Sequence, residues 1–388
     1  MMVAPRRVCL TITTRGNYGK LKSVTEALVR SPYLEPFVVV GGGALLERYG
    51  GVIELVRANY AAPVSWELPY LVEGETPLAM AKSAALAAVE FSTMLHQAQP
   101  DVVLVLADRY ECLPMAMAAT YLNIPVAHIE GGEVTGSVDE SIRHAITKLA
   151  HFHFPATEDA ARRIAALGEE KECIEVVGST SLDVIAKLDL EDLRPVVEAQ
   201  GTGGMGPVVS LEGPYLVVIQ HAVTTEFDEA RRQAEATLGA IRDIQLPTIW
   251  IVGNMDAGNN AIFGAVQQFL HSEHPNYLHL FSALPIERYA PLLKNAACLV
   301  GNSSSGIRES LFLGTPTVNI GNRQAGRERG ANVLDVAHDR AAIVAAIRQQ
   351  LAHGPYPADF RFGDGKAAER IAKRLESVAF RLQKRITF

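Results

Sequence analysis

The alternation of short apolar runs with alanine-rich helical patterns is the feature that most constrains the fold of this chain. The apolar runs are continuous, which is typical of parallel strands that are buried on both faces. We expect strands at 8–14, 37–40, 102–106, 125–129, 152–155, 174–177, 215–219, 248–252, 278–281, 298–300 and 317–320. Helical patterns lie between them at 76–97, 137–150, 225–244 and 285–296. This order predicts an α/β fold made of doubly wound parallel sheets.

The length of 388 residues allows about two domains. The clearest boundary is the Gly/Pro-rich stretch 189–214, which we predict to be a linker without a helix. The expected domains then span 1–188 and 215–366, and the segment 367–388, with a basic amphipathic helix at 367–385, is expected to pack back on the first domain. Ligands of such sheets bind beyond the carboxyl ends of the strands, so we expect the active site on the strand-end loops, in an interdomain cleft.

The composition excludes several classes of partner. The chain has 36 Lys and Arg against 43 Asp and Glu and no basic run, so we expect no nucleic-acid partner. Its longest apolar stretches have the length of strands, so we expect no membrane span. The four cysteines, Cys9, Cys112, Cys173 and Cys298, stand far apart and form no CxxC pair. They predict neither a zinc site nor a disulfide framework, and they fit the reducing cytosol, so the expected location is cytoplasmic.

A serine-rich turn at 300–310 is the strongest sign of a phosphate site. A strand is expected to end at Val300 and a helix to begin near Ser304. Small residues let a phosphate approach the backbone, and the N-terminus of a helix favours an anion. The hydroxyls of Ser303 and Ser304 can add donors, and Glu309 can accept from ribose hydroxyls. The same residues also fit an ordinary serine N-cap.

Cationic and donor groups stand on matching loops. Arg15 and Lys20 follow the first strand, His221 follows the first strand of the second half, and Arg323 follows the last strand. Their common position predicts a clamp for a diphosphate. The glycines at 41–43 lack the partner glycine of a dinucleotide fingerprint, since position 46 is leucine. We interpret them as a tight turn that leaves room for a ligand, and we expect no cofactor.

Carboxylates follow consecutive strands of the first domain. Asp108 and Glu130 each come directly after an apolar strand, and Asp139 opens the next predicted helix. Clustered carboxylates raise one another's pKa, which allows a general acid and a general base at neutral pH. Glu130 precedes two glycines, so we expect its carboxylate to be uncovered. Asp108 also fits a helix cap, and Asp139 fits a partner of the helix dipole.

The acidic region also contains candidate ion pairs, but it lacks the spacing of metal ligands. Arg143 and His144 stand one helical turn after Asp139 and Glu140, so they fit ion-pair partners on the same helix face. No HxH or DxD spacing is present, so we expect no metal.

Together these motifs resemble the hydrolysing UDP-N-acetylglucosamine 2-epimerases, a family that includes bacterial sialic-acid enzymes and the epimerase half of the bifunctional animal enzyme. The resemblance is carried by the block 130–149, which begins Glu-Gly-Gly-Glu, and it extends over essentially the whole chain. The other matching stretches are 15–20, 108–109, 220–225, 253–258, 301–304, Glu309, 314–316 and 323–324.

The resemblance implies two Rossmann-like domains in a glycosyltransferase-B-like fold, with UDP held between them. It also implies anti elimination of UDP across C1 and C2 to a glycal, followed by hydration to the free manno-configured sugar. The matching proton-transfer positions are Asp108, Glu130 and Asp139, with His221 as a further catalytic candidate that stabilises the leaving diphosphate. The matching substrate-binding positions are Arg15, Lys20, Arg109, Asn254, Leu284, Ser303, Ser304, Glu309 and Arg323.

The family contains more than one substrate, and the sequence departs from the animal pattern at two positions. Glu140 replaces a second Asp, and Gly19 replaces a Ser. Relatives in the legionaminic-acid pathway act on UDP-2,4-diacetamido-2,4,6-trideoxyglucose, so the resemblance leaves this sugar and UDP-N-acetylglucosamine open. It also implies a homodimer or homotetramer. The alternatives are a glycosyltransferase with the same fold, which would not need three carboxylates around the sugar, and a non-catalytic regulator that binds nucleotide sugars.

Overall fold

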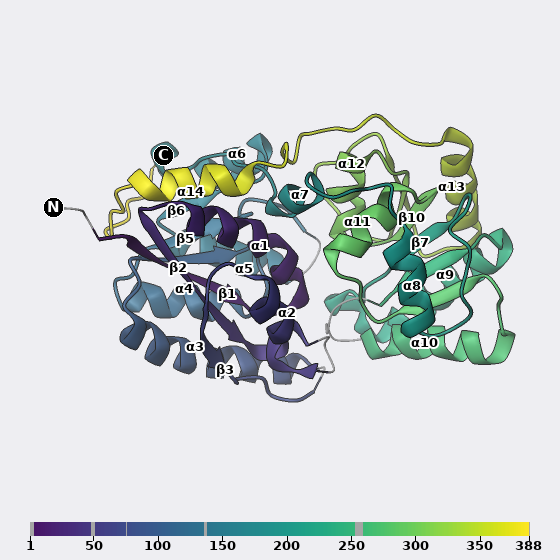
Figure 1. The fold of residues 1–388 in the computed structure, drawn as a ribbon, viewed down its shortest axis with the longest axis horizontal. Coiled ribbons are helices and arrows are strands. Elements are labelled where there is room, and N and C mark those ends of the chain that lie inside the picture. Colours follow the sequence, from purple (N-terminus) through teal and green to yellow (C-terminus); the bar gives the residue numbers. More distant parts are fainter. Residues whose placement is uncertain (1–3, 48–50, 75, 136–137, 253–258, 388) are drawn as a thin grey trace. The chain divides into compact units, whose positions relative to one another are not determined.

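The computed structural model describes residues 4–47, 51–74, 76–135, 138–252 and 259–387 (Figure 1). It contains two compact units, each built around its own parallel sheet. The first unit comprises Met1–Glu133, Val138–Ala186 and Arg361–Phe388, and the second comprises Val134–Ser137 and Lys187–Phe360. The predicted α/β fold with doubly wound parallel sheets is therefore confirmed.

The first sheet has the strand order β3-β2-β1-β4-β5-β6, and all its pairs are parallel. Its strands are β1 (Arg6–Ile12), β2 (Leu34–Gly41), β3 (Val64–Leu68), β4 (Val102–Leu106), β5 (Val126–Ile129) and β6 (Phe152–Phe154). One face packs on α1 (Arg15–Arg30), α2 (Val52–Asn59) and α14 (Ala367–Ser377), and the other packs on α3 (Pro77–Ala98), α4 (Cys112–Tyr121) and α5 (Asp139–Leu149). The helices α6 (Glu158–Ala166) and α7 (Thr180–Ile185) complete this unit.

The second sheet has the order β12-β11-β10-β7-β8-β9, which is the same topology when its strands are counted from β7. Its strands are β7 (Leu216–Ile219), β8 (Thr248–Ile251), β9 (Leu278–Phe281), β10 (Cys298–Gly301), β11 (Thr317–Ile320) and β12 (Val333–Val336). The helices of this unit are α8 (Arg194–Thr202), α9 (Ala230–Ile244), α10 (Asn259–Glu273), α11 (Ile286–Lys294), α12 (Glu309–Leu313) and α13 (Arg340–His353). In both sheets the strand order reverses beside the first strand, where such folds bind ligands.

The differences from the predicted elements have physical causes. β3 and β12 were not predicted because both are half-exposed edge strands, which lack a continuous apolar run. The predicted strand 174–177 is wrong, since this segment makes only a single parallel bridge from Ile174 to His153. The C-terminal helix ends at Ser377, earlier than predicted.

The stretch 189–214 contains a helix, contrary to the prediction. α8 begins at Arg194 with Pro195 in its first turn, a position where proline is favourable because its fixed φ suits the helix. The side-chain amide of Gln200 then forms two hydrogen bonds with the backbone of Val209, at 2.8 and 3.2 Å. These bonds hold the glycine-rich residues against the helix. The helix was not predicted because the composition of the segment does not reveal these bonds.

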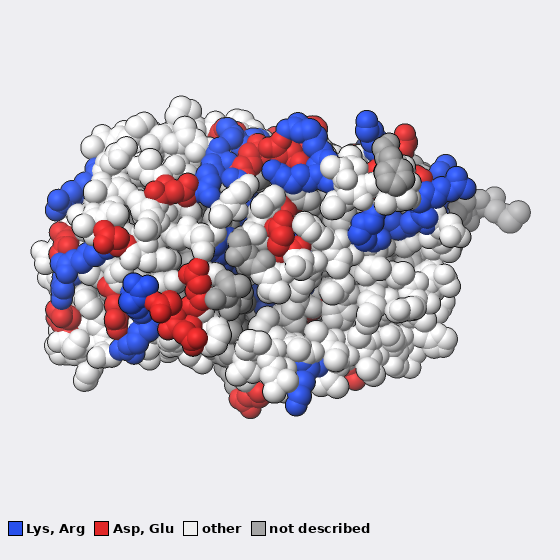
Figure 2. Space-filling model, turned by 180° about the vertical axis from the view of Figure 1, so that it is seen from behind, with Lys and Arg blue, Asp and Glu red and all other residues white. Residues whose placement is uncertain are grey.

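Helix α3 is long and apolar enough to cross a membrane by length and composition alone, although polar residues interrupt its apolar stretches. An 18-residue window of it reaches a mean hydropathy of 1.3, and 33 % of that window is buried. A single helix of this kind is weak evidence for a membrane protein, because core helices of soluble proteins meet the same criterion. Seen from behind, the lower right region of the molecule, where α3 and α4 lie, shows almost no charged side chains (Figure 2).

The chain after α14 is tied to the first unit by a buried carboxylate. Glu169 is 3 % exposed and contacts Lys148 at 2.6 Å, His153 at 3.1 Å and Lys384 at 2.6 Å. Burial raises the pKa of Glu169, but its hydrogen bonds with His153, Lys148 and Lys384 outweigh this and lower the pKa to about 2. Lys384 also donates to the carbonyl oxygens of Thr147 and Lys148, near the end of α5.

We predict that Glu169→Gln destabilises the protein by about 3 kcal/mol, because removing one member of a buried ion pair leaves its partners uncompensated. The effect should be present above pH 4.5, where the carboxylate would be ionised in both states, and should fade as the pH falls toward 2. Urea unfolding at several pH values measures it. Asp243→Asn removes the exposed ion pair with Arg340 and is the matched control, which should cost less than about 1 kcal/mol. Equal effects of the two substitutions would contradict the prediction.

Candidate active site

Glu130 lies at the carboxyl end of β5 and is sealed from solvent. Its side chain is 0 % exposed, so the expectation of an uncovered carboxylate is wrong. Lys20 Nζ lies 2.6 Å from Oε2, and the Ser179 hydroxyl donates to Oε1 at 2.6 Å. Both carboxylate oxygens therefore have a fixed partner, one of them cationic. Lys20 was predicted to bind substrate, and in the structure it pairs with Glu130.

The two glycines after Glu130 serve close packing. A Cβ at Gly131 would lie 2.7 Å from the ring of His128, and one at Gly132 would lie 2.3 Å from the carbonyl oxygen of Ala160. Gly132 also has φ +75°, and Glu130 itself has φ +59°, a left-handed conformation that a non-glycine residue seldom adopts. The glycines thus let the strand end turn sharply against α6, and this turn places the carboxylate inside the protein.

His128 connects the ends of β4 and β5. It is fully buried, and its Nε2 lies 2.8 Å from the carbonyl oxygen of Ala107. Because a carbonyl only accepts, Nε2 carries the proton. Burial lowers the pKa of His128 to about 4, against a smaller raising effect of the hydrogen bond that its ring donates to the carbonyl oxygen of Ala107. The ring is therefore neutral at pH 7. Its hydrogen bond fixes the backbone of Ala107, the residue before Asp108.

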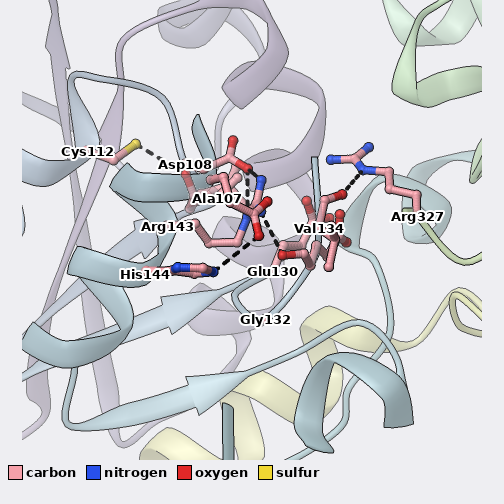
Figure 3. Close-up of polar contacts among 12 residues, drawn as sticks. Ala107, Asp108, Cys112, Glu130, Gly132, Val134, Arg143, His144 and Arg327 are labelled. Carbon is pink, nitrogen blue, oxygen red and sulfur yellow. Dashed lines mark hydrogen bonds and ion pairs between the residues drawn. The ribbon is translucent and has the colours of Figure 1, made fainter. Parts of the chain in front are cut away.

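Asp108 follows Ala107 and pairs with the buried guanidinium of Arg143 (Figure 3). Arg143 Nε donates to Asp108 Oδ2 at 2.9 Å, and a second nitrogen contacts the same oxygen. Arg143 also donates to Glu140 at 2.9 Å and to the carbonyl oxygen of Glu133 at 2.6 Å. Burial lowers the pKa of Arg143, but the carboxylates of Asp108, Glu133 and Glu140 outweigh burial and raise it. The acids thus gather around a shared cation.

The remaining acidic and basic candidates of the first unit lie on the same sheet edge. Asp139 is the first residue of α5 and is half-buried. His144 contacts Glu140 at 3.2 Å, which agrees with one of the ion pairs expected on this helix. Arg15 is the first residue of α1, directly after β1. Arg109 pairs with the buried Glu111, its Nε 3.2 Å from Oε2.

The glycines at 41–43 form the predicted tight turn, but at Gly41 and Gly42 there is no room for a ligand. Gly42 has φ +55° and begins a 3₁₀ turn. A Cβ at Gly41 or Gly42 would lie within 3 Å of the ring of Tyr70. The space beside the backbone is therefore filled by an aromatic side chain of the protein.

In the second unit, Asn302 organises the edge that carries His221. Its side chain accepts from the backbone N–H of His221 at 2.7 Å and donates to the carbonyl oxygen of the same residue at 2.9 Å. The preceding Gly301 has φ +134°, and a Cβ there would lie 2.0 Å from the carbonyl oxygen of Ile219. Glycine is thus required where β10 approaches the end of β7.

Arg323 and Gln324 complete this arrangement. Arg323 donates to the carbonyl oxygen of Asn302 at 3.2 Å, and Gln324 donates to the same oxygen at 2.8 Å. His221 and Arg323 are therefore connected through Asn302. Leu284 lies partly exposed between β9 and α11. Asn254 lies outside the described residues.

The serine-rich turn differs from the predicted helix start. Residues Ser304–Gly306 form a 3₁₀ turn, and α12 begins only at Glu309 and is five residues long. Ser303 accepts from the backbone N–H of Ser305 at 3.3 Å, as in the N-cap interpretation. The carboxylate of Glu309 is buried, and its Oε2 has no hydrogen-bond partner within the described part of the chain. This turn is therefore followed by a helix of only five residues, and it carries a buried carboxylate oxygen that lacks a donor among the described residues.

Three residues of these clusters were not assigned a role from the sequence. Ser179 lies on a turn of small residues just after the predicted strand 174–177. Asp108 was chosen because it follows a predicted strand, and the same criterion would have found Ser179. His128 and Asn302 act through the backbone of neighbouring loops, and no sequence pattern marks such contacts. Among the described residues, no group of three or more His, Cys, Asp or Glu side chains is placed to hold a metal ion.

Comparison with known proteins gives a consistent result. The sequence model of a family described as UDP-N-acetylglucosamine 2-epimerase matches residues 26–376. A protein of Legionella pneumophila named UDP-N,N'-diacetylbacillosamine 2-epimerase (hydrolyzing) is 32% identical over 378 residues, 97% of each chain. A UDP-N-acetylglucosamine 2-epimerase of Neisseria meningitidis is 32% identical over 372 residues, 95% of this chain and 94% of that protein.

Solved structures share the fold. The crystal structure of a UDP-GlcNAc 2-epimerase from Neisseria meningitidis bound to UDP-GlcNAc has a TM-score of 0.77 at 17% identity and covers 95% of this chain and 99% of that one. The Methanocaldococcus jannaschii UDP-GlcNAc 2-epimerase in complex with UDP-GlcNAc and UDP has a TM-score of 0.76 at 19% identity, with the same coverage. The predicted glycosyltransferase-B-like fold is confirmed.

We predict that His128 makes the protein less stable in acid. Its pKa is about 4 when folded and 6.5 as a free side chain, so the unfolded chain binds more protons between these values. Stability should therefore rise with pH across this window, by up to about 3 kcal/mol at about 1.4 kcal/mol per pKa unit. Urea unfolding of wild type and His128→Gln between pH 4 and 7 should give a flatter profile for the variant. The exposed His96→Gln is the control, and unchanged slopes in both variants would contradict the assignment.

Proposed function

Since this chain belongs to the UDP-N-acetylglucosamine 2-epimerase family, we propose that it is the hydrolysing type, which releases UDP and a free manno-configured sugar. The observation that carries the proposal is the buried acid–cation arrangement at the ends of β4 and β5. The name of the Legionella relative, which is similar over almost the whole chain, supports the hydrolysing assignment.

The proposed reaction has two steps. A carboxylate accepts the proton from C2 of the sugar while the C1–O bond to UDP breaks, and the electron pair of the C–H bond forms the C1=C2 bond of a glycal. Water then adds its oxygen at C1, and C2 takes a proton on the opposite face. Asp108, Glu130 and Asp139 are the proposed proton-transfer groups. The fixed partners of Glu130 and Asp108 support these roles, because a pre-oriented group needs little rearrangement when charge moves.

The second unit is proposed to hold the nucleotide. His221, Ser303, Ser304 and Arg323 would face the diphosphate, where donors stabilise the charge that develops as UDP leaves. The open Oε2 of buried Glu309 supports a contact to a ribose hydroxyl, since a buried carboxylate oxygen needs a donor. Arg15, Lys20, Arg109, Asn254 and Leu284 complete the proposed substrate-binding set. In this proposal Lys20 acts through Glu130.

The substrate is proposed to be UDP-N-acetylglucosamine or its 2,4-diacetamido-2,4,6-trideoxy analogue, and relatives similar to this chain carry names of both kinds. We also propose a homo-oligomer and a cytoplasmic location. The four cysteines are all free in the structure, which supports a reducing compartment.

We predict that the enzyme in deuterated water converts a UDP-sugar to UDP and a free manno sugar with deuterium at C2. Proton NMR and chromatography of parallel reactions with the two candidate UDP-sugars measure the products. A UDP-linked manno sugar would instead show a non-hydrolysing epimerase, and transfer only to an added acceptor would show a glycosyltransferase. Turnover of neither UDP-sugar would contradict the proposed substrate class.

We predict that Asp108→Asn, Glu130→Gln and Asp139→Asn each lower turnover at least ~10²-fold, because an amide keeps the shape but cannot transfer the proton. Ser179→Ala should cost less, since it removes only one of two partners of Glu130. At least one amide variant should release the glycal. Separate measurement of UDP, glycal and free sugar tests this, with Glu235→Gln in an exposed ion pair as the control. Wild-type turnover in all three amide variants would remove the proton-transfer assignment.

A further inference from the structure

The three consecutive serines after β10 have different surroundings. Ser303 and Ser304 are half-buried, whereas Ser305 is only 8 % exposed. A buried hydroxyl needs a hydrogen-bond partner, because the loss of its bonds to water is otherwise not compensated. Ser305 has this partner in Tyr289 on α11, with 2.5 Å between the two hydroxyl oxygens. The first two serines are therefore accessible to a ligand, and the third is bound to the protein interior.

Tyr289 is itself enclosed by the protein. It lies within α11 and is 9 % exposed. Burial raises the pKa of Tyr289, against a smaller lowering effect of its hydrogen bond with Ser305, and the nearby Glu309 carboxylate raises it further. The phenol is therefore protonated at pH 7. Because Glu309 Oε2 has no hydrogen-bond partner within the described part of the chain, the Tyr289–Ser305 contact lies near an oxygen that needs a donor.

The backbone of Ser305 extends this contact to Ser303. The N–H of Ser305 donates to Ser303 Oγ at 3.3 Å. A serine hydroxyl has one hydrogen to donate and two lone pairs that accept. Because Ser303 Oγ already accepts from this N–H, its own hydrogen points away from the Ser305 backbone. That hydrogen is available to a phosphate oxygen, which is a strong acceptor.

Other hydrogen bonds hold the inner side of the serine-rich turn. The N–H of Gly306 donates to the carbonyl oxygen of Ser303 at 3.0 Å, and the Ser310 hydroxyl donates to the carbonyl oxygen of Gly306 at 2.7 Å. The side chain of Asn332 donates in turn to Ser310 Oγ at 3.0 Å. The turn therefore has several anchors, so we expect it to stay folded when the Tyr289 hydroxyl is removed.

From these contacts we propose that Tyr289 and Ser305 are positioning residues for the nucleotide. They hold the N–H of Ser305 on Ser303 Oγ, so that the Ser303 hydroxyl donates its hydrogen to the diphosphate of the UDP-sugar. The inference rests on the proposed function, in which Ser303 faces the diphosphate. A donor whose direction is fixed before binding loses little conformational freedom when the ligand arrives. Tyr289 thus strengthens UDP binding without touching UDP.

Tyr289→Phe tests this role, because it removes one oxygen and keeps the ring. Calorimetric titration of the full chain with UDP should show binding weakened about 5-fold, the size expected for one buried hydrogen bond. Tyr215→Phe is the matched control, since the buried Tyr215 hydroxyl donates at 2.7 Å to the carbonyl oxygen of Leu292 on the same helix. This control should leave UDP affinity unchanged. Equal weakening in both variants would assign the effect to the anchoring of α11 and overturn the proposal.

A double-mutant cycle tests whether Tyr289 acts through Ser303. In a Ser303→Ala background, Tyr289→Phe should not weaken UDP binding further, because the hydroxyl that it positions is gone. Ser305→Ala should weaken binding as much as Tyr289→Phe, and the two together should be no worse than either alone. Additive losses in either pair would overturn the proposal. Circular dichroism shows that each variant is folded.

The same titrations separate this inference from the proposed function. A folded wild type that does not bind UDP would overturn the proposed function and this inference with it. If the wild type binds UDP and Tyr289→Phe binds it equally tightly, the proposed function stands and only the positioning role is wrong.

Discussion

The buried guanidinium of Arg143 is the interaction on which the acidic edge of the first sheet depends. Three acidic residues, Asp108, Glu133 and Glu140, direct a carboxylate or a carbonyl oxygen toward it. Without a central cation, carboxylates gathered at one edge would repel one another and take up protons. Lys20 plays the same part for Glu130 one strand away. Positive charge inside the protein thus allows acids to collect where parallel strands end.

The sequence predicted the parts of this molecule that local pattern controls. Buried strands such as β4 and β10 read as continuous apolar runs because both of their faces are covered. The edge strands β3 and β12 have one open side and therefore no such run. α8 was missed because it is stabilised by Gln200, whose partner Val209 lies outside the helix. The amino-acid composition of a segment does not predict such contacts.

For the candidate site, too, the sequence predicted the location of residues but not their contacts. Parallel topology alone placed Asp108, Glu130 and His221 at strand ends, so their location followed from the order of the elements. Their surroundings did not, because the partners come from distant parts of the chain: Ser179 reaches Glu130 across 49 positions, and Asn302 reaches His221 across 81. The prediction that the Glu130 carboxylate is uncovered was wrong because it rested on the two following glycines. Small residues occur where the chain packs closely as often as where it leaves open space. Telling the two apart requires knowledge of what packs beside the turn.

The register between β4 and β5 gives Asp108 and Glu130 different exposure to solvent. Leu106 pairs with Ile129, so Ala107 and Glu130 occupy equivalent places, and both have φ +59°. Asp108 therefore stands one position further along its loop than Glu130 does. That offset leaves 17 % of the Asp108 side chain open and none of the Glu130 side chain. A proton on the partly open Asp108 side chain can therefore exchange with bulk water more readily than one on the enclosed Glu130 side chain, so the two strand ends should differ in how fast they take up the hydrogen isotope of the solvent.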